Sequence, residues 1–165
     1  MKPTNRHSDR VSTTLAMQMT DVDHYHALVH SEAVVSEDAI VGAAAEWRGR
    51  TTEHRAIVSA GAVIREYATV HAGVERPTII GPRTLLMTKA HVGHDTQIGA
   101  DCDIAPNASI GGCVTIGDRV KIGMNACVRP HVTIGDGARI GMGAAVVCDI
   151  PAGETWAGVP ARRIR

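Results

Sequence analysis

The chain has 165 residues, with 17 Lys and Arg against 17 Asp and Glu, so its formal net charge is zero. No basic surface is indicated, which argues against nucleic acid or anionic membrane as a partner. Phe is absent and aromatic residues make up 2% of the chain, so an aromatic core is excluded. The composition is that of one soluble globular domain.

The N-terminal segment, residues 1–27, is polar and rich in His, Asp and Thr. It contains no apolar stretch long enough for a signal peptide or a membrane span. We expect an N-terminal arm or short cap here, partly helical from Thr13.

Residues 28–151 are predicted to form the main domain, and their first part carries an imperfect six-residue spacing of apolar residues. The positions in phase are Leu28, Val34, Ile40, Glu46, Thr52, Val58, Ile64 and Val70, of which Glu46 and Thr52 are polar. We expect a first coil interrupted by a loop around residues 47–54. From Val70 to Ile80 the spacing is ten, so four extra residues should leave the coil near Val74–Pro77 and form a functional loop of residues 74–79.

From residue 80 to residue 146 an aliphatic residue returns at every sixth position. The set is Ile80, Leu86, Val92, Ile98, Ile104, Ile110, Ile116, Ile122, Val128, Ile134, Ile140 and Val146. A helix has a period of 3.6 and a strand a period of 2, so a period of six indicates short strands separated by turns. Similar segments also recur after about eighteen residues, so three hexads should make one coil of an all-β parallel β-helix.

Two other positions of the hexad fit this fold. The residue after each repeat position is often Gly, which suits a tight bend or a positive φ. The residue two positions before it is small or β-branched, as expected inside a narrow prism. The repeat ends at Asp149–Pro151, and residues 152–165 are predicted to be a C-terminal tail that caps the exposed β-edge.

The four cysteines, Cys102, Cys113, Cys127 and Cys148, show no paired spacing. Reduced thiols are therefore expected, which favours a cytoplasmic location.

One corner of the predicted coil carries residues suited to chemistry. His94 lies at a turn position, where a neutral imidazole can act as a general base, and Asp95 can orient it. Gly112, one coil further along, could present its backbone N–H to the space above His94 as an oxyanion donor. A surface histidine with an ordinary capping aspartate, and a double Gly that only permits a turn, are the plainer alternatives.

These motifs resemble the hexapeptide-repeat acyltransferases, a family of left-handed parallel β-helix enzymes. Two segments, Arg65–His71 and Leu85–Asp95, are similar to the UDP-N-acetylglucosamine O-acyltransferases of lipid A synthesis. Other motifs resemble the amino-sugar N-acetyltransferases and sialic-acid O-acetyltransferases, namely His94–Asp95, Gly111–Gly112, Ile122–Met124, Ile140–Met142 and Ala157–Ala161. The left-handed assignment comes from this resemblance alone.

The resemblance implies an acyltransferase, most simply an acetyltransferase, in which acetyl-CoA or another acyl-CoA donates to an amine or hydroxyl of a small, sugar-like acceptor. It also implies a homotrimer, with His94 as base, Asp95 as its partner and the Gly112 amide as oxyanion donor. The backbones of Met124 and Met142 would line the pantetheine arm of CoA. His71, Lys89, His91 and Arg76 are expected to bind the acceptor, Arg76 through a phosphate or carboxylate. Cys113 and Asp103 stand where the two branches carry histidines.

Two other classes stay open. His71, His91 and His94 could form a zinc site like that of the γ-class carbonic anhydrases. The gap from His91 to His94 is three, whereas those enzymes space this pair five apart, so no metal is expected. A non-catalytic β-helix used as an assembly platform is the remaining alternative.

Overall fold

The computed structural model describes residues 27–45, 49 and 51–164. In this part of the chain all regular secondary structure is β-strand. Most strands are two or three residues long and are separated by tight turns. The strands are β1 (Ala27–Val29), β2 (Val34–Val35), β3 (Ile40–Ala43), β4 (Ala56–Val58), β5 (Val63–Ile64), β6 (Thr69–His71), β7 (Thr78–Ile80), β8 (Leu85–Leu86), β9 (His91–Val92), β10 (Gln97–Ile98), β11 (Asp103–Ile104), β12 (Ser109–Ile110), β13 (Thr115–Ile116), β14 (Lys121–Ile122), β15 (Cys127–Val128), β16 (Thr133–Ile134), β17 (Arg139–Ile140), β18 (Ala145–Val146), β19 (Thr155–Ala157) and β20 (Arg162–Arg163).

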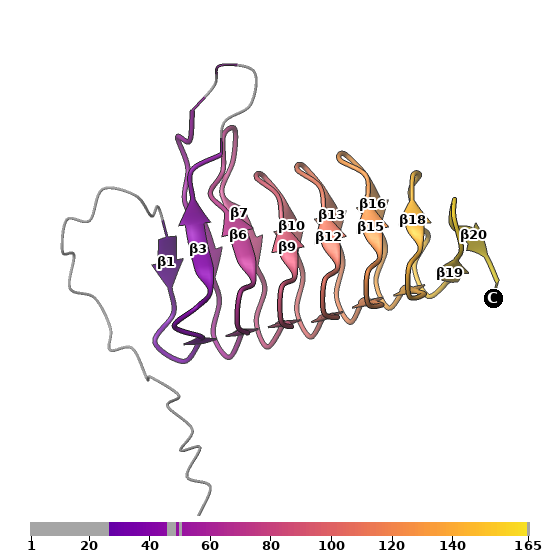
Figure 1. The fold of residues 1–165 in the computed structure, drawn as a ribbon, viewed down its shortest axis with the longest axis horizontal. Helices are drawn as coiled ribbons and strands as arrows, with labels where there is room; N and C mark the ends of the chain where they lie inside the picture. The colour runs from indigo at the N-terminus through magenta and orange to yellow at the C-terminus, as the bar shows by residue number, and fades with distance from the viewer. Residues whose placement is uncertain (1–26, 46–48, 50, 165) are drawn as a thin grey trace, which may run out of the picture.

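The strands stack into three sheets that run along the solenoid (Figure 1). Sheet A holds β3, β6, β9, β12, β15 and β18, sheet B holds β1, β4, β7, β10, β13 and β16, and sheet C holds the other eight strands. From β1 to β15 each strand pairs in parallel with the strand three places later. At the C-terminal end β17 pairs in parallel with β19, and β20 pairs antiparallel with β19. The first eighteen strands therefore make six coils of three strands, and the prediction of an all-β parallel β-helix, consistent with the left-handed form, is confirmed.

The core is the predicted aliphatic ladder. All twelve repeat residues from Ile80 to Val146 are at most 4% exposed, and the small residues two positions before them are buried as well. In-register stacking puts like on like, as with Ile104 between Leu86 and Ile122. Burying one such side chain is worth roughly 1.5–3 kcal/mol, so the ladder replaces the missing aromatic core.

The glycines after the repeat positions serve close packing and not a positive φ. The left-handed residues lie two positions later in the turn and include Asn107 and Asn125, at φ of 58° and 57°. At Gly93, by contrast, a Cβ would come within 2.6 Å of the Gly112 nitrogen on the next coil. The positive φ offered from sequence is therefore not the reason for these glycines, which instead permit the close approach of neighbouring coils.

The two ends of the solenoid differ from its middle. Leu28, Val34 and Ile40 keep the hexad phase but are 44%, 39% and 40% exposed, because they lie in the first coil with no described coil packed over them. The expected arm of residues 1–27 lies outside the described residues, apart from Ala27. At the other end the tail extends sheet C, since Trp156 of β19 pairs with Ile140 of β17.

The connections between sheets A and B form one edge of the solenoid, the upper edge in Figure 1, and they position the site. The longest is the connection from β3 to β4, in which Thr52 Oγ1 binds the backbone of Ala45. The next is residues 72–77 between β6 and β7. The predicted loop of residues 74–79 is therefore too long at its C-terminal end, because Thr78 and Ile79 belong to β7. Within the described part of the chain, no helix is long and apolar enough to cross a membrane.

Candidate functional site

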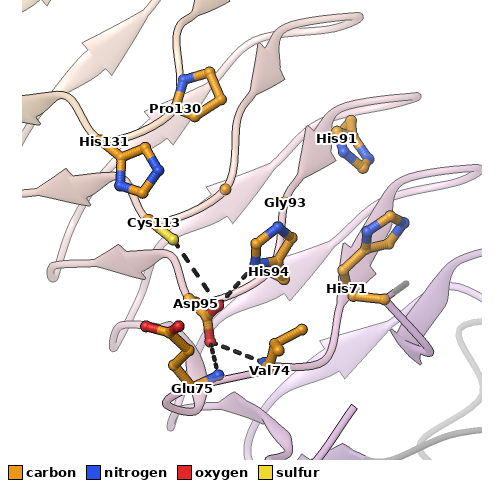
Figure 2. A pocket seen from close by; sticks show the side chains of 12 residues that line it. His71, Val74, Glu75, His91, Gly93, His94, Asp95, Cys113, Pro130 and His131 are labelled. Atoms are coloured by element: carbon orange, nitrogen blue, oxygen red, sulfur yellow. Dashed lines mark hydrogen bonds and ion pairs between the residues drawn. The ribbon is translucent and has the colours of Figure 1, made fainter. Parts of the chain in front are cut away.

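A pocket of about 340 Å³ lies along the edge between sheets A and B (Figure 2). It is built mainly from four successive turns, residues 72–77, 93–96, 111–114 and 129–132, each from a different coil, and Ala45 of the β3–β4 connection also lines it. The lining residues are Ala45, His71, Val74, Glu75, His91, Gly93, His94, Asp95, Gly112, Cys113, Pro130 and His131.

The floor of the pocket repeats one backbone conformation every eighteen residues. Asp95, Cys113 and His131 occupy the same turn position in consecutive coils and all adopt a left-handed φ, of 61°, 60° and 64°. Backbone hydrogen bonds lock the turns together: the Cys113 N–H donates to the His94 carbonyl at 2.8 Å, and the His131 N–H donates to the Gly112 carbonyl at 3.1 Å. This stacking brings the three side chains to one corner.

His94 and Asp95 form a hydrogen-bonded pair within the pocket. The distance from His94 Nδ1 to Asp95 Oδ2 is 2.7 Å, and the side chains are 19% and 2% exposed. When the carboxylate is ionised it can only accept, so the neutral imidazole must carry its proton on Nδ1. The lone pair is then on Nε2, which is the arrangement a general base requires.

The other carboxylate oxygen of Asp95 is held by the loop before β7. Asp95 Oδ1 accepts hydrogen bonds from three consecutive backbone amides, those of Val74, Glu75 and Arg76, at 2.9, 2.8 and 2.9 Å. Burial by itself would raise the pKa of Asp95. The hydrogen bonds from the Arg76 amide, from His94 and from the other two amides outweigh it and lower the pKa of this carboxyl below its usual value.

Gly112 lies against the imidazole of His94. A Cβ at Gly112 would come within 2.7 Å of His94 Nε2, so only glycine leaves the ring its present position. Within the described residues no hydrogen bond engages the Gly112 amide, whereas the amides of Gly111 and Cys113 on either side donate to backbone carbonyls. An N–H placed beside a candidate base nitrogen is what an oxyanion donor needs.

His71 and His91 lie together on the other side of His94 from Cys113 and His131 (Figure 2). Their ring centroids are 4.8 Å apart in an edge-to-face arrangement, and Thr69 Oγ1 lies 2.8 Å from His91 Nδ1. Burial lowers the pKa of both rings, helped by the charge of His94 in the case of His71 and by that of His71 in the case of His91. Both imidazoles are therefore kept neutral near pH 7 and can exchange hydrogen bonds with a polar ligand.

One group of potential metal ligands gathers in the described part of the chain, and it differs from the three histidines considered from sequence. Ligand atoms of His94, Asp95 and Cys113 lie within 4.8 Å of one another. Both oxygens of Asp95 already accept hydrogen bonds, and burial next to the Asp95 charge raises the pKa of the Cys113 thiol. A neutral thiol and an engaged carboxylate make a poor donor set for zinc.

The structure brings together five of the residues expected from sequence, namely His71, His91, His94, Asp95 and Gly112. Lys89, Met124 and Met142 are exposed and do not line the pocket. Arg76 lies at the edge, where its Nε donates to the Asp95 carbonyl at 2.8 Å.

Sequence reasoning missed three features of the pocket. His131 could have been found, because it stands eighteen residues after Cys113 and thirty-six after Asp95 in an unbroken register. The backbone amides of the loop, which hold Asp95, and the position of Glu75 carry no signal in the sequence.

Comparison with known proteins agrees with the parallel β-helix fold. The family model of the bacterial transferase hexapeptide, a unit of six repeats, matches residues 77–112 and 113–147. A point mutant of perosamine N-acetyltransferase from Caulobacter crescentus, solved with CoA and GDP-perosamine, is 27% identical over 86% of this chain and 58% of its own, with a TM-score of 0.62. The acetyltransferase domain of PglB from Neisseria gonorrhoeae, solved with acetyl-CoA, is 33% identical over 86% and 58%, with a TM-score of 0.51.

LpxA from Acinetobacter baumannii is 25% identical over 86% of this chain and 61% of its own, with a TM-score of 0.71. The chain therefore spans 58% to 61% of the length of these three solved chains. The expected resemblance to both branches is confirmed, and the repeats of residues 77–147 match the hexapeptide model of bacterial transferases.

Proposed function

We propose that this protein is an acyltransferase that moves an acyl group, most simply acetyl, from CoA to an amine or hydroxyl of a small, sugar-like acceptor. The observation that carries the proposal is the His94–Asp95 pair beneath the Gly112 amide, in a pocket. The solved relatives support the donor and the acceptor class, since two of them were solved with CoA or acetyl-CoA and one of these with a nucleotide sugar.

In the proposed reaction His94 Nε2 removes the proton from the acceptor amine or hydroxyl as this group attacks the thioester carbonyl. The carbonyl oxygen becomes negatively charged and accepts a hydrogen bond from the Gly112 N–H. Collapse of the tetrahedral intermediate breaks the C–S bond, and the leaving CoA thiolate takes the proton from the imidazolium. Asp95 stabilises that imidazolium without taking its proton.

Binding in the pocket would convert a bimolecular transfer into a nearly unimolecular one. We propose that His71 and His91 contact the acceptor, with Lys89 reaching it from the rim. The backbones of Met124 and Met142 are proposed to line the pantetheine arm in an active site between subunits of a homotrimer. Met124 and Met142 are 44% and 69% exposed, which leaves them accessible to such a ligand. A cytoplasmic location remains our expectation.

The test is mass spectrometry of the full chain incubated with acetyl-CoA and a panel of free amino sugars and nucleotide-linked sugars. An acetylated product that forms with wild-type protein and falls by about 10²–10⁴ in rate with His94→Ala supports the proposal. Cys127→Ala, at an exposed residue outside the pocket, is the control. Near-wild-type turnover of His94→Ala would remove His94 as the base.

Two other functions stay open, a zinc enzyme like the γ-carbonic anhydrases and a non-catalytic assembly platform. The first has little support, because His91 is engaged by Thr69 and the cluster around His94 involves Asp95 and Cys113 in place of two histidines. A platform gives no reason for a buried carboxylate held beside an imidazole. Absence of activity in the wild-type protein with every donor and acceptor tested would favour the platform.

A further inference from the structure

Between residue 56 and residue 146 the hexad register is broken only once, at the connection of residues 72–77. Backbone amides of this connection donate hydrogen bonds to a single oxygen atom. Three successive N–H groups donate to Asp95 Oδ1, which lies about twenty residues further along the chain. A side chain of the loop also contacts Asp95, since Arg76 Nε donates to the Asp95 carbonyl oxygen. Asp95 is thus held by the loop at both its carboxylate and its backbone.

The loop has a defined shape because glycine starts it. A Cβ at Gly73 would collide with the carbonyl oxygen of Arg76 and lie 3.2 Å from Asp95 Oδ1. The backbone of Gly73 is in turn fixed by the β3–β4 connection: its N–H donates to the His54 carbonyl at 3.1 Å, and its carbonyl accepts from the amides of Glu53 and His54 at 3.2 and 3.0 Å. The amides that face Asp95 are therefore preorganised before any ligand binds.

The direction of the Asp95 carboxylate follows from this arrangement. With Oδ1 fixed by three amides, Oδ2 has to lie on the side of His94, at 2.7 Å from Nδ1. The amides also favour the ionised form, in agreement with the lowered pKa of Asp95. An ionised oxygen at this position accepts a hydrogen bond and cannot donate one, so it selects the imidazole tautomer with its proton on Nδ1.

We propose that residues 73–77 are the positioning element of the active site, and that they act through Asp95 to hold His94 in the tautomer with its lone pair on Nε2. The proposal rests on the role proposed above for His94 as general base. In this proposal the four extra residues between Val70 and Ile80 serve to position His94, and Arg76 is a positioning residue. The three later turns between sheets A and B, residues 93–96, 111–114 and 129–132, close the solenoid without such an insertion, so closing the coil does not require it.

The test compares Gly73→Ala and Arg76→Ala with the wild-type chain. Arg83→Ala is the matched control, because Arg83 is an exposed arginine whose Nε and Nη2 bind Asp101 at a different corner and it does not line the pocket. The first readout is the ¹⁵N spectrum of the imidazoles at pH 8, assigned to His94 by its loss in His94→Ala. The second is the separation of kcat from the acceptor KM, and the third is Tm.

We expect the wild-type and Arg83→Ala proteins to show His94 protonated on Nδ1. In Arg76→Ala and Gly73→Ala the signals should shift towards the Nε2–H tautomer, with kcat lowered about 10- to 100-fold and the acceptor KM within about twofold of wild type. Arg76→Lys, which retains a donor for the Asp95 carbonyl, should recover part of the loss. If Gly73→Ala does not fold, Arg76→Ala and Arg76→Lys decide the question.

An unchanged tautomer in Arg76→Ala overturns the proposal, whatever happens to its stability. A raised acceptor KM with an unchanged tautomer and kcat would show instead that Arg76 binds the acceptor, as the sequence suggested. The spectral readout needs no substrate. A shifted tautomer in a protein without transferase activity would therefore refute the proposed function while leaving the positioning role intact.

Discussion

Gly112 lies against the imidazole of His94, which belongs to the adjacent coil. The ring occupies the space that a side chain at residue 112 would need, since a Cβ there would lie 2.7 Å from Nε2 and 2.9 Å from Cε1. The contact joins the proposed base to the proposed oxyanion donor and leaves no room for a side chain between them. This contact therefore restricts residue 112 to glycine more strictly than backbone conformation alone restricts a glycine in a turn.

Gly112→Ala should lower turnover by about 10²-fold or more, because the methyl group displaces the His94 ring or the amide that stabilises the oxyanion. Steady-state rates and Tm, measured on the same preparation, check this. Gly137→Ala is the control: its φ of 66° makes alanine unfavourable there, yet a Cβ would meet nothing within 4 Å, so it should lose stability and keep turnover. Equal effects of the two substitutions on turnover would mean that Gly112 matters only to the fold.

Asp95→Asn should preserve the fold and still lower kcat by about 10³–10⁴. The amide oxygen can accept the three loop N–H groups, but its NH₂ group would donate to His94 Nδ1 and move the imidazole proton to Nε2. Circular dichroism, Tm and kcat are the measurements. A variant with wild-type kcat would show that the tautomer of His94 has no part in catalysis.

Metal should be dispensable for activity. Both carboxylate oxygens of Asp95 are hydrogen-bonded, and His91 Nδ1 is hydrogen-bonded to Thr69 Oγ1. A zinc ion would therefore have to break existing hydrogen bonds. We expect elemental analysis of the purified protein to find well under one zinc per chain, and EDTA to leave the acetyl transfer rate unchanged. Stoichiometric zinc, with activity lost on chelation and restored by the metal, would favour the carbonic-anhydrase-like alternative.

Stability should decrease on mild acidification because of the two half-buried imidazoles of His71 and His91. The pKa values of His71 and His91 are lowered from 6.5, so below this pH the unfolded chain binds protons that the folded chain does not. The free energy of unfolding should therefore fall as pH drops from about 6.5 through the lowered pKa values. The slope is at most about 1.4 kcal/mol per pH unit for each ring and smaller for partly exposed ones.

Urea unfolding between pH 8 and pH 5 measures this slope. His91→Gln should flatten it, whereas His30→Gln, at an exposed position of the first coil, should not. An unchanged slope in His91→Gln would show that the ring is already solvated in the folded protein.

The sequence predicted the core well, because the solenoid repeats one environment. Ile104 and Ile122 are buried at the positions that the hexad assigns, and each coil reports on the next. The positive φ expected at these glycines was wrong, and the reason found in the structure was missed, since close approach between coils depends on three-dimensional packing that a local pattern does not encode. The loop was located from a break in spacing, but its partner Asp95 lies some twenty residues away. Backbone donors such as the Val74 amide exist whatever the residue type, so no sequence signal marks them.

The pocket draws on the turns between sheets A and B in successive coils, and backbone hydrogen bonds between neighbouring turns hold them in place. In a solenoid, each unit contacts only the adjacent units, so stability is a sum of local terms. Local unfolding of any one coil that lines the pocket would consequently destroy the site while the coils beyond it stay stacked. Inactivation by heat or denaturant and collapse of the β-structure are then separate events, and a spectroscopic melting curve would overestimate how long the protein stays competent.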